Sequence, residues 1–234
     1  MQLFYNAEIS EASDSFTFDR EESKHIIKVM RKQGGDKVYV TNGLGYLFTT
    51  EIEVASDTKC IVKIVSAEKA LPAKYRLHLA VAPTKMNDRF EWFLEKATEI
   101  GLSEITPVIC DRSERKTIKT ERFEKIMQSA MKQSLQYYLP KLNEPIAFAD
   151  FMKLPQQGLK FIAHCEDSDK KSLKDILQPG CDLTMLIGPE GDFSQKEINL
   201  ALENNYIPVS LGGTRLRTET AAIVACHSVA FVNE

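Results

Sequence analysis

The arrangement of apolar and polar positions divides this chain of 234 residues into two parts. Up to about residue 70, short runs rich in β-branched and aromatic residues are separated by glycine-bearing turns, which is typical of β-strands. From about residue 75, apolar runs alternate with segments of helical periodicity, which predicts a largely parallel sheet covered by helices. The stretch from Ala67 to Tyr75 contains Pro72 and is expected to be a linker. We therefore predict a small β-rich domain over residues 1–70 and an α/β domain over residues 75–234.

The first domain is predicted to contain one helix among its strands. The strands are expected at residues 3–5, 16–18, 37–41, 46–54 and 60–65. The Asp19 side chain can cap the helix together with Glu22, and the helical pattern continues to Arg31. Lys24, Lys28 and Arg31 would then share one face, at i, i+4 and i+7. Such a cationic face is either solvated surface or a surface that binds phosphates, and the pattern leaves both open.

In the second domain, strands and helices are predicted in alternation. Strands are expected at residues 77–82, 105–110 and 159–165 and in the apolar runs that begin at Leu183 and Val209. Helices are expected at residues 89–100, 121–138, 148–153, 170–177 and 220–232, with one more directly after Ser194. Gly101 is the expected stop of the first of these helices. The last helix is expected to bury Ile223, Val224 and Phe231 and to offer a surface for dimerisation.

Two glycine-bearing loops are the main chemical signal of the second domain. Gly188-Pro189-Glu190-Gly191 follows the run from Leu183, and Leu211-Gly212 follows the run from Val209. Glycine permits positive φ and close approach of the backbone, and loops at the carboxyl ends of parallel strands are where α/β folds bind ligands. The spacing is neither that of a dinucleotide fingerprint nor that of a P-loop. The two loops therefore predict a single pocket built mostly from backbone.

Helix starts are expected beside both loops. Ser194 and Glu197 have the spacing of a capping box, which places a helix directly after the first loop. Thr218 or Thr220 can cap the last helix in the same way. The free amides at both helix starts would then point toward the pocket, where they favour anions.

Composition excludes several classes of protein. Apolar residues make up 43% of the chain, enough for a core, yet no apolar run is long enough to span a membrane and the N-terminus lacks the features of an export signal. The five cysteines are scattered and never in C-x-x-C spacing, which predicts reduced thiols in the cytoplasm and neither disulfides nor a zinc site. The formal net charge is −3, so contact with nucleic acid would need a local basic surface.

Basic residues gather directly after the strand expected at residues 105–110. The segment from Asp111 to Lys119 contains Arg112, Arg115 and two lysines. Basic loops are often only solvated surface, but a loop at the carboxyl edge of the sheet can also reach the pocket. Both interpretations remain open from the pattern.

The two glycine loops, with Arg217-Thr218-Glu219-Thr220-Ala221 after the second, closely resemble the signature of the RsmE family. Its members are S-adenosylmethionine-dependent methyltransferases of small-subunit ribosomal RNA in the SPOUT class. The resemblance implies an α/β SPOUT methyltransferase domain with a C-terminal trefoil knot, preceded by a small PUA-like β-barrel that binds RNA. His25-x-x-x-Val29-x-Arg31 is similar to that N-terminal module, and Arg112-Ser113 matches a pair in the family.

The chain departs from the family pattern at two places. Family members usually carry arginines in the first few residues, where this chain has Gln2 and Asn6. Lys132 and Gln136 stand where the family usually has a glutamate and an arginine. The RNA contacts of the N-terminus and the role of Gln136 are therefore left open.

The resemblance also implies which residues bind S-adenosylmethionine and RNA. The cofactor would lie against the two glycine loops and the loop after Ala163. The implied cofactor-binding residues are Leu186, Ile187, Gly188, Pro189, Glu190, Gly191, Leu211, Gly212, Leu216 and Thr218. The implied RNA-binding residues are Lys24, Lys28, Arg31, Arg112, Arg115 and Lys132.

The implied reaction is methyl transfer to N3 of a uridine in 16S ribosomal RNA, at the position usually numbered 1498. The N3 proton must leave, and charge then spreads onto the uracil oxygens, where donors or cations stabilise it. Arg217 and Arg112 are the candidates for that role; Glu219 is either a base or a helix cap, and the cap is favoured. The target base is expected to be extruded, no metal is required, and a cytoplasmic homodimer acting on the small subunit is implied.

Two other functions compete with this one. A SPOUT ribose 2′-O-methyltransferase would share the fold and the cofactor, but Arg217–Ala221 and the N-terminal module argue against it. A ribosome-assembly factor that binds RNA without catalysis is a second alternative. The intact loop Gly188–Gly191 argues against it. Measurable cofactor binding would distinguish a methyltransferase from such an assembly factor.

Overall fold

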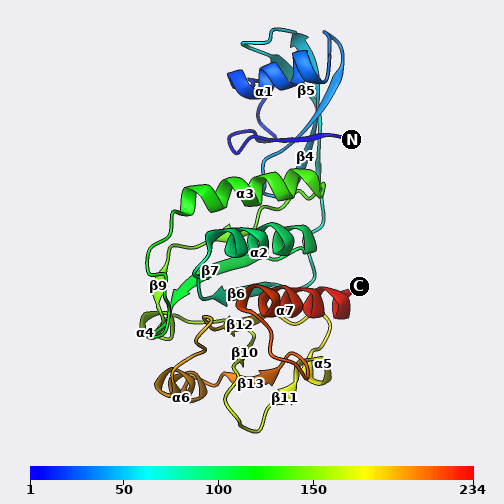
Figure 1. The fold of residues 1–234 in the computed structure, drawn as a ribbon. Coiled ribbons are helices and arrows are strands. Elements are labelled where there is room, and N and C mark those ends of the chain that lie inside the picture. The colour runs from blue at the N-terminus through cyan, green and yellow to red at the C-terminus, as the bar shows by residue number, and fades with distance from the viewer. The chain divides into compact units, whose positions relative to one another are not determined.

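The computed structural model describes residues 1–234 and divides them into two compact units. The first comprises Met1–Pro72 and Met131–Leu139, and the second comprises Ala73–Ala130 and Pro140–Glu234. The segment Met131–Leu139 therefore packs with the N-terminal residues, although it lies far along the chain. Each unit is visible in Figure 1, where the first is coloured mainly blue and cyan.

The first unit is built on a five-stranded sheet in the order β1-β3-β4-β5-β2. Its strands are β1 (Leu3–Tyr5), β2 (Ser15–Thr17), β3 (Lys37–Thr41), β4 (Tyr46–Val54) and β5 (Ile61–Lys69). All five predicted strands are thus present. Pairing is antiparallel except between β1 and β3. The core of this unit is mainly apolar, with Phe4, Ile26, Val40 and Phe48 at most 1% exposed.

The predicted N-terminal helix differs from its expected form. An α-helix, α1 (Arg20–Lys24), continues as a π-helical turn over His25–Val29. Asp19 caps it as predicted, by accepting the Glu22 backbone N–H at 2.8 Å. Arg31 lies beyond the helix end with φ 57°. Because the π-helical turn alters the α-helical spacing and Arg31 is outside the helix, the expected single cationic face at i, i+4 and i+7 was wrong.

The segment Met131–Leu139 is held by the first unit through backbone hydrogen bonds. The Gly45 N–H donates to Tyr137 O at 2.8 Å, and the Leu139 N–H donates to Gly43 O at 2.9 Å. Gly45 has φ +92°, and a Cβ there would overlap the Tyr138 ring. Helix α3 (Thr120–Gln133) ends within the first residues of this segment, whereas the periodicity predicted a helix to residue 138. The reason is tertiary: the chain leaves the helix to pair its backbone with the first unit.

The second unit contains an eight-stranded sheet in which every pairing is parallel. Its main order is β11-β13-β10-β12-β6-β7-β8, and β9 pairs with β7. The strands are β6 (Leu77–Val81), β7 (Glu104–Ile109), β8 (Lys141–Leu142), β9 (Ile146–Ala147), β10 (Leu159–Ala163), β11 (Lys171–Ser172), β12 (Leu183–Ile187) and β13 (Ile207–Ser210). β6 and β12 are buried at every position, as expected for strands covered on both faces.

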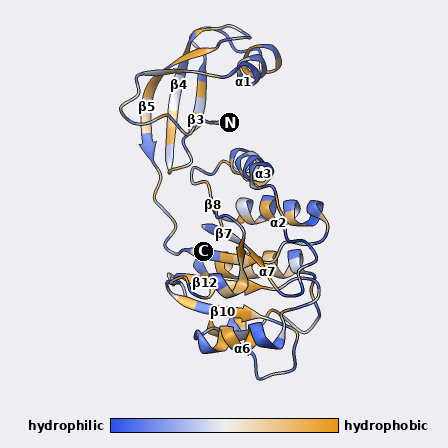
Figure 2. Cartoon of the chain, turned by 90° about the vertical axis from the view of Figure 1, so that its left-hand side faces the viewer, coloured by the Kyte–Doolittle hydropathy of each residue, from blue (hydrophilic) through white to orange (hydrophobic).

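Helices cover both faces of this sheet. They are α2 (Asn87–Ile100), α4 (Phe148–Phe151), α5 (Leu173–Ile176), α6 (Gln195–Glu203) and α7 (Thr218–Asn233). Helices α2 and α7 lie side by side on one face (Figure 1), and α4 and α6 share an apolar cluster with β10 and β12. Figure 2 shows the resulting pattern, with hydrophobic residues concentrated in the central strands and hydrophilic residues on the outer surface of α6. The predicted α/β fold is confirmed; the trefoil knot stays a prediction of the resemblance.

Several predicted elements of the second unit differ in extent. Gly101 ends α2 in the left-handed conformation, as predicted. The helix expected at residues 170–177 is instead the short strand β11 followed by the single turn α5. Phe231 was expected to be buried but is 67% exposed, and Ile223 and Val224 are only partly buried. Phe231 follows the buried Val229 by two positions, which places it on the side of α7 opposite to the buried Ala222, Ala225, Cys226 and Val229.

Candidate active site

A cavity of about 640 Å³ lies at the carboxyl ends of β10, β12 and β13. Three loops line it: residues 163–165 after β10, residues 187–192 after β12, and residues 209–218 between β13 and α7. Because the strands are parallel, their carboxyl ends meet at one edge and bring these distant loops together. The pocket predicted from the two glycine loops is therefore present.

The loop after β12 turns tightly before α6. A Cβ at Gly188 would lie 3.0 Å from the Phe193 ring, which leaves no room for a larger residue unless the ring moves. The turn closes with a hydrogen bond from Asp192 N to Pro189 O, and Asp192 has φ 63°. Ser194 and Glu197 then form the predicted capping box in full, since each side chain accepts the other residue's backbone N–H.

Four neighbouring segments are tied to this loop by hydrogen bonds. The Lys85 N–H donates to Glu190 Oε1 at 2.9 Å, and the Cys165 N–H donates to Asp192 Oδ2 at 2.8 Å. Arg112 Nη1 donates to Gly191 O at 3.0 Å and to Phe193 O at 3.3 Å. These bonds come from the segments after β6, β10 and β7, and the fourth comes from the start of α7. The loop is therefore held in one conformation from several sides.

The start of α7 differs from the prediction. Arg217 is the N-cap residue and makes no capping hydrogen bond, and neither Thr218 nor Thr220 serves as the cap. The Thr218 hydroxyl donates instead to Gly188 O at 2.9 Å, which links the two glycine loops. Because no side chain caps this helix, its first N–H groups are available to an anionic group in the pocket.

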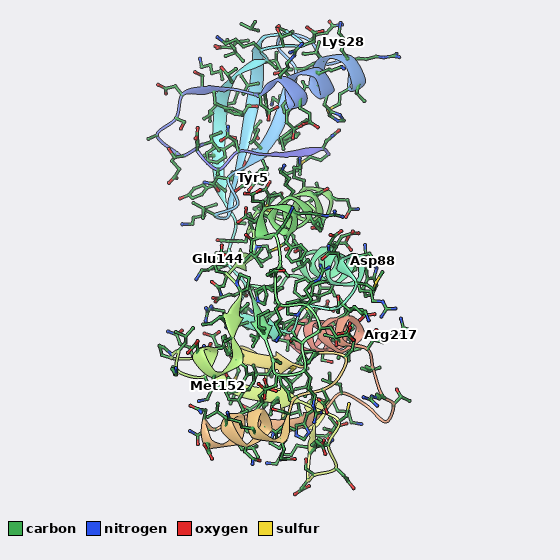
Figure 3. The ribbon with its side chains drawn as sticks, turned by 60° about the vertical axis from the view of Figure 1, so that its left-hand side comes forward. Tyr5, Lys28, Asp88, Glu144, Met152 and Arg217 are labelled. Carbon is green, nitrogen blue, oxygen red and sulfur yellow. The ribbon has the colours of Figure 1, made fainter.

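The three residues predicted to be catalytic occupy different places. Arg217 lines the pocket and is exposed at the start of α7 (Figure 3). The Arg112 guanidinium is bound to the loop carbonyls and does not line the pocket. Glu219 is 7% exposed and lies behind the pocket, with Oε1 3.8 Å from Arg89 Nε and Oε2 without a hydrogen-bond partner.

Most of the predicted cofactor-binding residues line the cavity. These are Ile187, Gly188, Pro189, Glu190, Leu211, Gly212, Leu216 and Thr218. Leu186 is buried in the sheet, and Gly191 lies outside the cavity against Arg112. His164 and Cys165, in the predicted loop after Ala163, and Ala221 of the signature also line it, together with residues that the sequence analysis did not single out: Lys170, Asp192, Ser210, Gly213, Thr214 and Arg215. For all of these but Lys170, a position between or beside the glycine motifs was the available signal.

The predicted RNA-binding residues fall into two groups. Lys24, Lys28, Arg31 and Lys132 belong to the first unit, whereas Arg112 and Arg115 belong to the second. Lys28 is exposed and pairs with Asp57 at 3.3 Å (Figure 3). Lys132 Nζ is bound to Glu22 Oε1 at 2.9 Å, so the Glu22 carboxylate is turned away from the helix cap.

Two buried histidines of the second unit make its stability depend on pH. Burial lowers the pKa of His78 below its usual 6.5, although the nearby Glu104 carboxylate acts in the opposite direction. Burial and the Lys170 charge likewise lower the pKa of His164, whose two ring nitrogens have no hydrogen-bond partner. Both imidazoles are therefore favoured in the neutral form.

We expect the protein to lose stability as the pH falls below 6.5. The unfolded chain then binds protons that the folded histidines reject, so each contributes a slope of at most about 1.4 kcal/mol per pH unit. Urea unfolding at pH 7.5, 6.5 and 5.5 measures this loss. His78→Asn should reduce the loss of unfolding free energy per pH unit below pH 6.5. Substitution of the exposed His227, His227→Asn, serves as the control. An unchanged slope in His78→Asn would contradict the assignment.

Comparisons with known proteins agree on one class. A model of an RNA methyltransferase domain matches residues 71–230, and a model of an RNA methyltransferase PUA domain matches residues 18–65. A Bacillus subtilis protein named Ribosomal RNA small subunit methyltransferase E is 27% identical, with the alignment covering 96% of this chain and 93% of that protein.

Solved structures are similar over almost the whole chain. A probable rRNA-methyltransferase from Porphyromonas gingivalis is 39% identical, covers 100% of this chain and 98% of its own, and superposes with a TM-score of 0.93. A putative methyltransferase from Legionella pneumophila, solved with bound S-adenosylmethionine, is 30% identical with a TM-score of 0.86, covering 99% of this chain and 97% of its own. Within this chain, no helix has the length and apolarity needed to cross a membrane, and no three His, Cys, Asp or Glu side chains gather as a metal site.

Proposed function

Because this chain belongs to the RNA methyltransferase family, we propose that it transfers the methyl group of S-adenosylmethionine to N3 of a uridine in 16S ribosomal RNA, at the position usually numbered 1498. The observation that carries the proposal is the pocket at the carboxyl edge of the sheet, which the two glycine loops form and Arg217 lines. The names of the curated relatives and the cofactor bound in the Legionella structure support the same activity.

The residues of the pocket fit S-adenosylmethionine. The cavity of about 640 Å³ is large enough for a nucleoside-sized ligand. Glu190 and Asp192 line it and suit the positive sulfonium and ammonium groups, whereas Lys170, Arg215 and the uncapped start of α7 suit a carboxylate. When bound, the cofactor supplies an electrophilic methyl group. The hydrogen-bonded loop after β12 fixes the backbone against which such a ligand is oriented.

Arg217 is the residue best placed to act on the target base. Loss of the N3 proton leaves negative charge on the uracil oxygens, and a guanidinium at the pocket stabilises that charge. Glu219 is better described as a partner of Arg89 that fixes the start of α7 against α2, because it is buried behind the pocket. Arg112 acts through the loop after β12 and is therefore a positioning residue rather than a catalytic one.

We expect Arg112→Ala to weaken cofactor binding about tenfold and to change kcat much less. The substitution removes a charged donor to two loop carbonyls, and a net loss of about 1.4 kcal/mol corresponds to that factor. Calorimetric titration with S-adenosylmethionine measures it. Arg115→Ala, in the same segment but not bound to the loop, is the matched control. Unchanged cofactor affinity with weaker RNA binding would instead favour the direct RNA contact that the resemblance implies.

The first unit supplies RNA binding in this proposal. It matches the PUA model, and Lys24 and Lys28 are exposed on its surface.

In the proposed cytoplasmic enzyme two chains form a homodimer through α7. The exposed Phe231, stacked on His227 at 5.9 Å between ring centroids, supports an apolar contact there. Light scattering of the wild type and of Phe231→Glu tests the dimer, which the charge should weaken.

The activity is tested with labelled S-adenosylmethionine and small subunits from cells that lack the gene. Label recovered in 3-methyluridine at a single position supports the proposal. Label in a 2′-O-methyl nucleoside would replace it with the ribose methyltransferase. Absence of any cofactor binding would favour a non-catalytic assembly factor.

A further inference from the structure

A second cavity, of about 560 Å³, lies at the opposite edge of the same sheet. Arg76 precedes β6 and His78 is the second residue of that strand, while Glu104 and Lys141 are the first residues of β7 and β8. These strands are parallel, so the cavity lies at their amino ends. The candidate active site lies at the carboxyl ends, and the two cavities share no lining residue.

The floor of this second cavity is a buried polar network. His78 shares one hydrogen bond with Thr106 Oγ1 at 2.7 Å and another with Gln156 Oε1 at 3.2 Å. Asn143 Nδ2 donates to Glu104 Oε1 at 2.6 Å and to Thr106 Oγ1 at 2.7 Å. His78, Glu104 and Thr106 are at most 6% exposed. Burying polar side chains costs free energy that apolar residues avoid, so this network indicates a role beyond packing.

The charges of the second cavity balance. Arg76 pairs with Glu104, and Lys141 Nζ lies 3.6 Å from the same carboxylate. Glu144, labelled in Figure 3, is also among the residues that line the cavity, so two cations face two carboxylates. His78 adds no charge near neutral pH, because burial lowers its pKa. A ligand with a strong net charge of either sign would meet a like charge, which favours a neutral ligand.

The remaining lining groups define the kind of neutral ligand. Three side-chain amides, those of Asn143, Gln156 and Gln157, line the cavity. The Asn143 amino group and the Gln156 oxygen already belong to the network, so the Asn143 oxygen and the Gln157 amide are the acceptor and donor groups that can meet a ligand. Apolar walls come from Ile146, Phe151, Leu154 and Pro155. Amides beside apolar and aromatic surfaces are what recognises the polar edge and the flat faces of a nucleobase. A cavity of this volume can hold a nucleoside.

We propose that this second cavity is a nucleobase-binding site, separate from the methyl-transfer site, which takes either an unpaired base of the RNA substrate or a free nucleoside. The inference rests on the lining residues alone. It does not depend on which reaction takes place at the carboxyl edge of the sheet.

Binding of 5-fluorouridine, followed by fluorine NMR with S-adenosylmethionine at saturation, tests the site. We expect a dissociation constant on the order of 1 mM, as is common for a ligand of this size without charged contacts. Leu154→Trp should weaken this binding at least about tenfold by filling the cavity. Leu154 is 47% exposed, so the larger ring can be placed without disrupting the core. Leu202→Trp is the matched control, since Leu202 is 43% exposed on α6 and lines neither cavity.

A cross-linking experiment separates the two sources of the base. RNA carrying 4-thiouridine should cross-link to residues 154–157 if the ligand is part of the substrate; binding of the nucleoside without cross-linking assigns the site to a free nucleoside. Arg217→Ala should leave the Leu154-dependent binding unchanged, which distinguishes it from binding at the methyl-transfer site. Wild-type binding that Leu154→Trp does not weaken, or no binding at all, would overturn the proposal.

Discussion

Arg217→Ala is expected to lower kcat by about 10²- to 10³-fold while leaving the affinity for S-adenosylmethionine nearly unchanged. That loss is typical when one donor to a developing oxyanion is removed. Arg217 is exposed at the pocket and makes no capping bond to α7, so its removal should not unfold the helix start. Single-turnover methylation of small subunits at saturating cofactor measures the chemical step, and cofactor titration measures affinity separately.

Arg215→Ala is the matched control for Arg217→Ala. Arg215 lies two residues away, lines the same cavity and is also exposed. We expect it to affect cofactor affinity more than kcat, because we assign it to the carboxylate side of the pocket. Arg217→Lys should recover part of the rate, since it keeps the charge but loses the planar donor geometry. Equal losses of kcat in Arg215→Ala and Arg217→Ala would refute a specific role for Arg217.

Gly158→Ala is expected to destabilise the second unit by about 3 kcal/mol or more, the largest effect on stability that we predict. Gly158 has φ +73°, and a Cβ there would overlap the backbone carbonyl of Asp182. Asp182 cannot easily move, because its carbonyl accepts the Leu159 N–H at 2.9 Å and its side chain accepts the Arg76 N–H at 2.7 Å. Thermal unfolding followed by circular dichroism should show Tm lowered by about 6 to 12 °C.

Gly180→Ala isolates the part of this effect that comes from φ alone. Gly180 has φ +74°, almost the same as Gly158, but a Cβ there would meet nothing within 4 Å. Its substitution should cost only about 1 kcal/mol. If the two variants were equally destabilised, the contact with Asp182 would carry no weight and the prediction for Gly158 would fail.

Features encoded within a few consecutive residues could be predicted from the sequence. The Ser194–Glu197 capping box joins residues three apart, and the left-handed stop at Gly101 needs only a glycine. The strands of the first unit follow from their apolar runs. The two glycine loops pointed to one pocket, because parallel strands place their carboxyl ends together. The chemical identity of that pocket came from the motif resemblance and not from periodicity.

Features that join residues far apart in the chain were decided only by the tertiary structure. Glu22 was expected to complete a helix cap, but its carboxylate binds Lys132, 110 positions along the chain. Thr218 or Thr220 was expected to cap α7, but neither does, and the Thr218 hydroxyl reaches Gly188, 30 positions away. The early end of α3 and the network around His78 have the same origin. A polar side chain forms hydrogen bonds with whichever partner the fold brings near. The spacing of residues along the chain does not predict a partner that is distant in sequence.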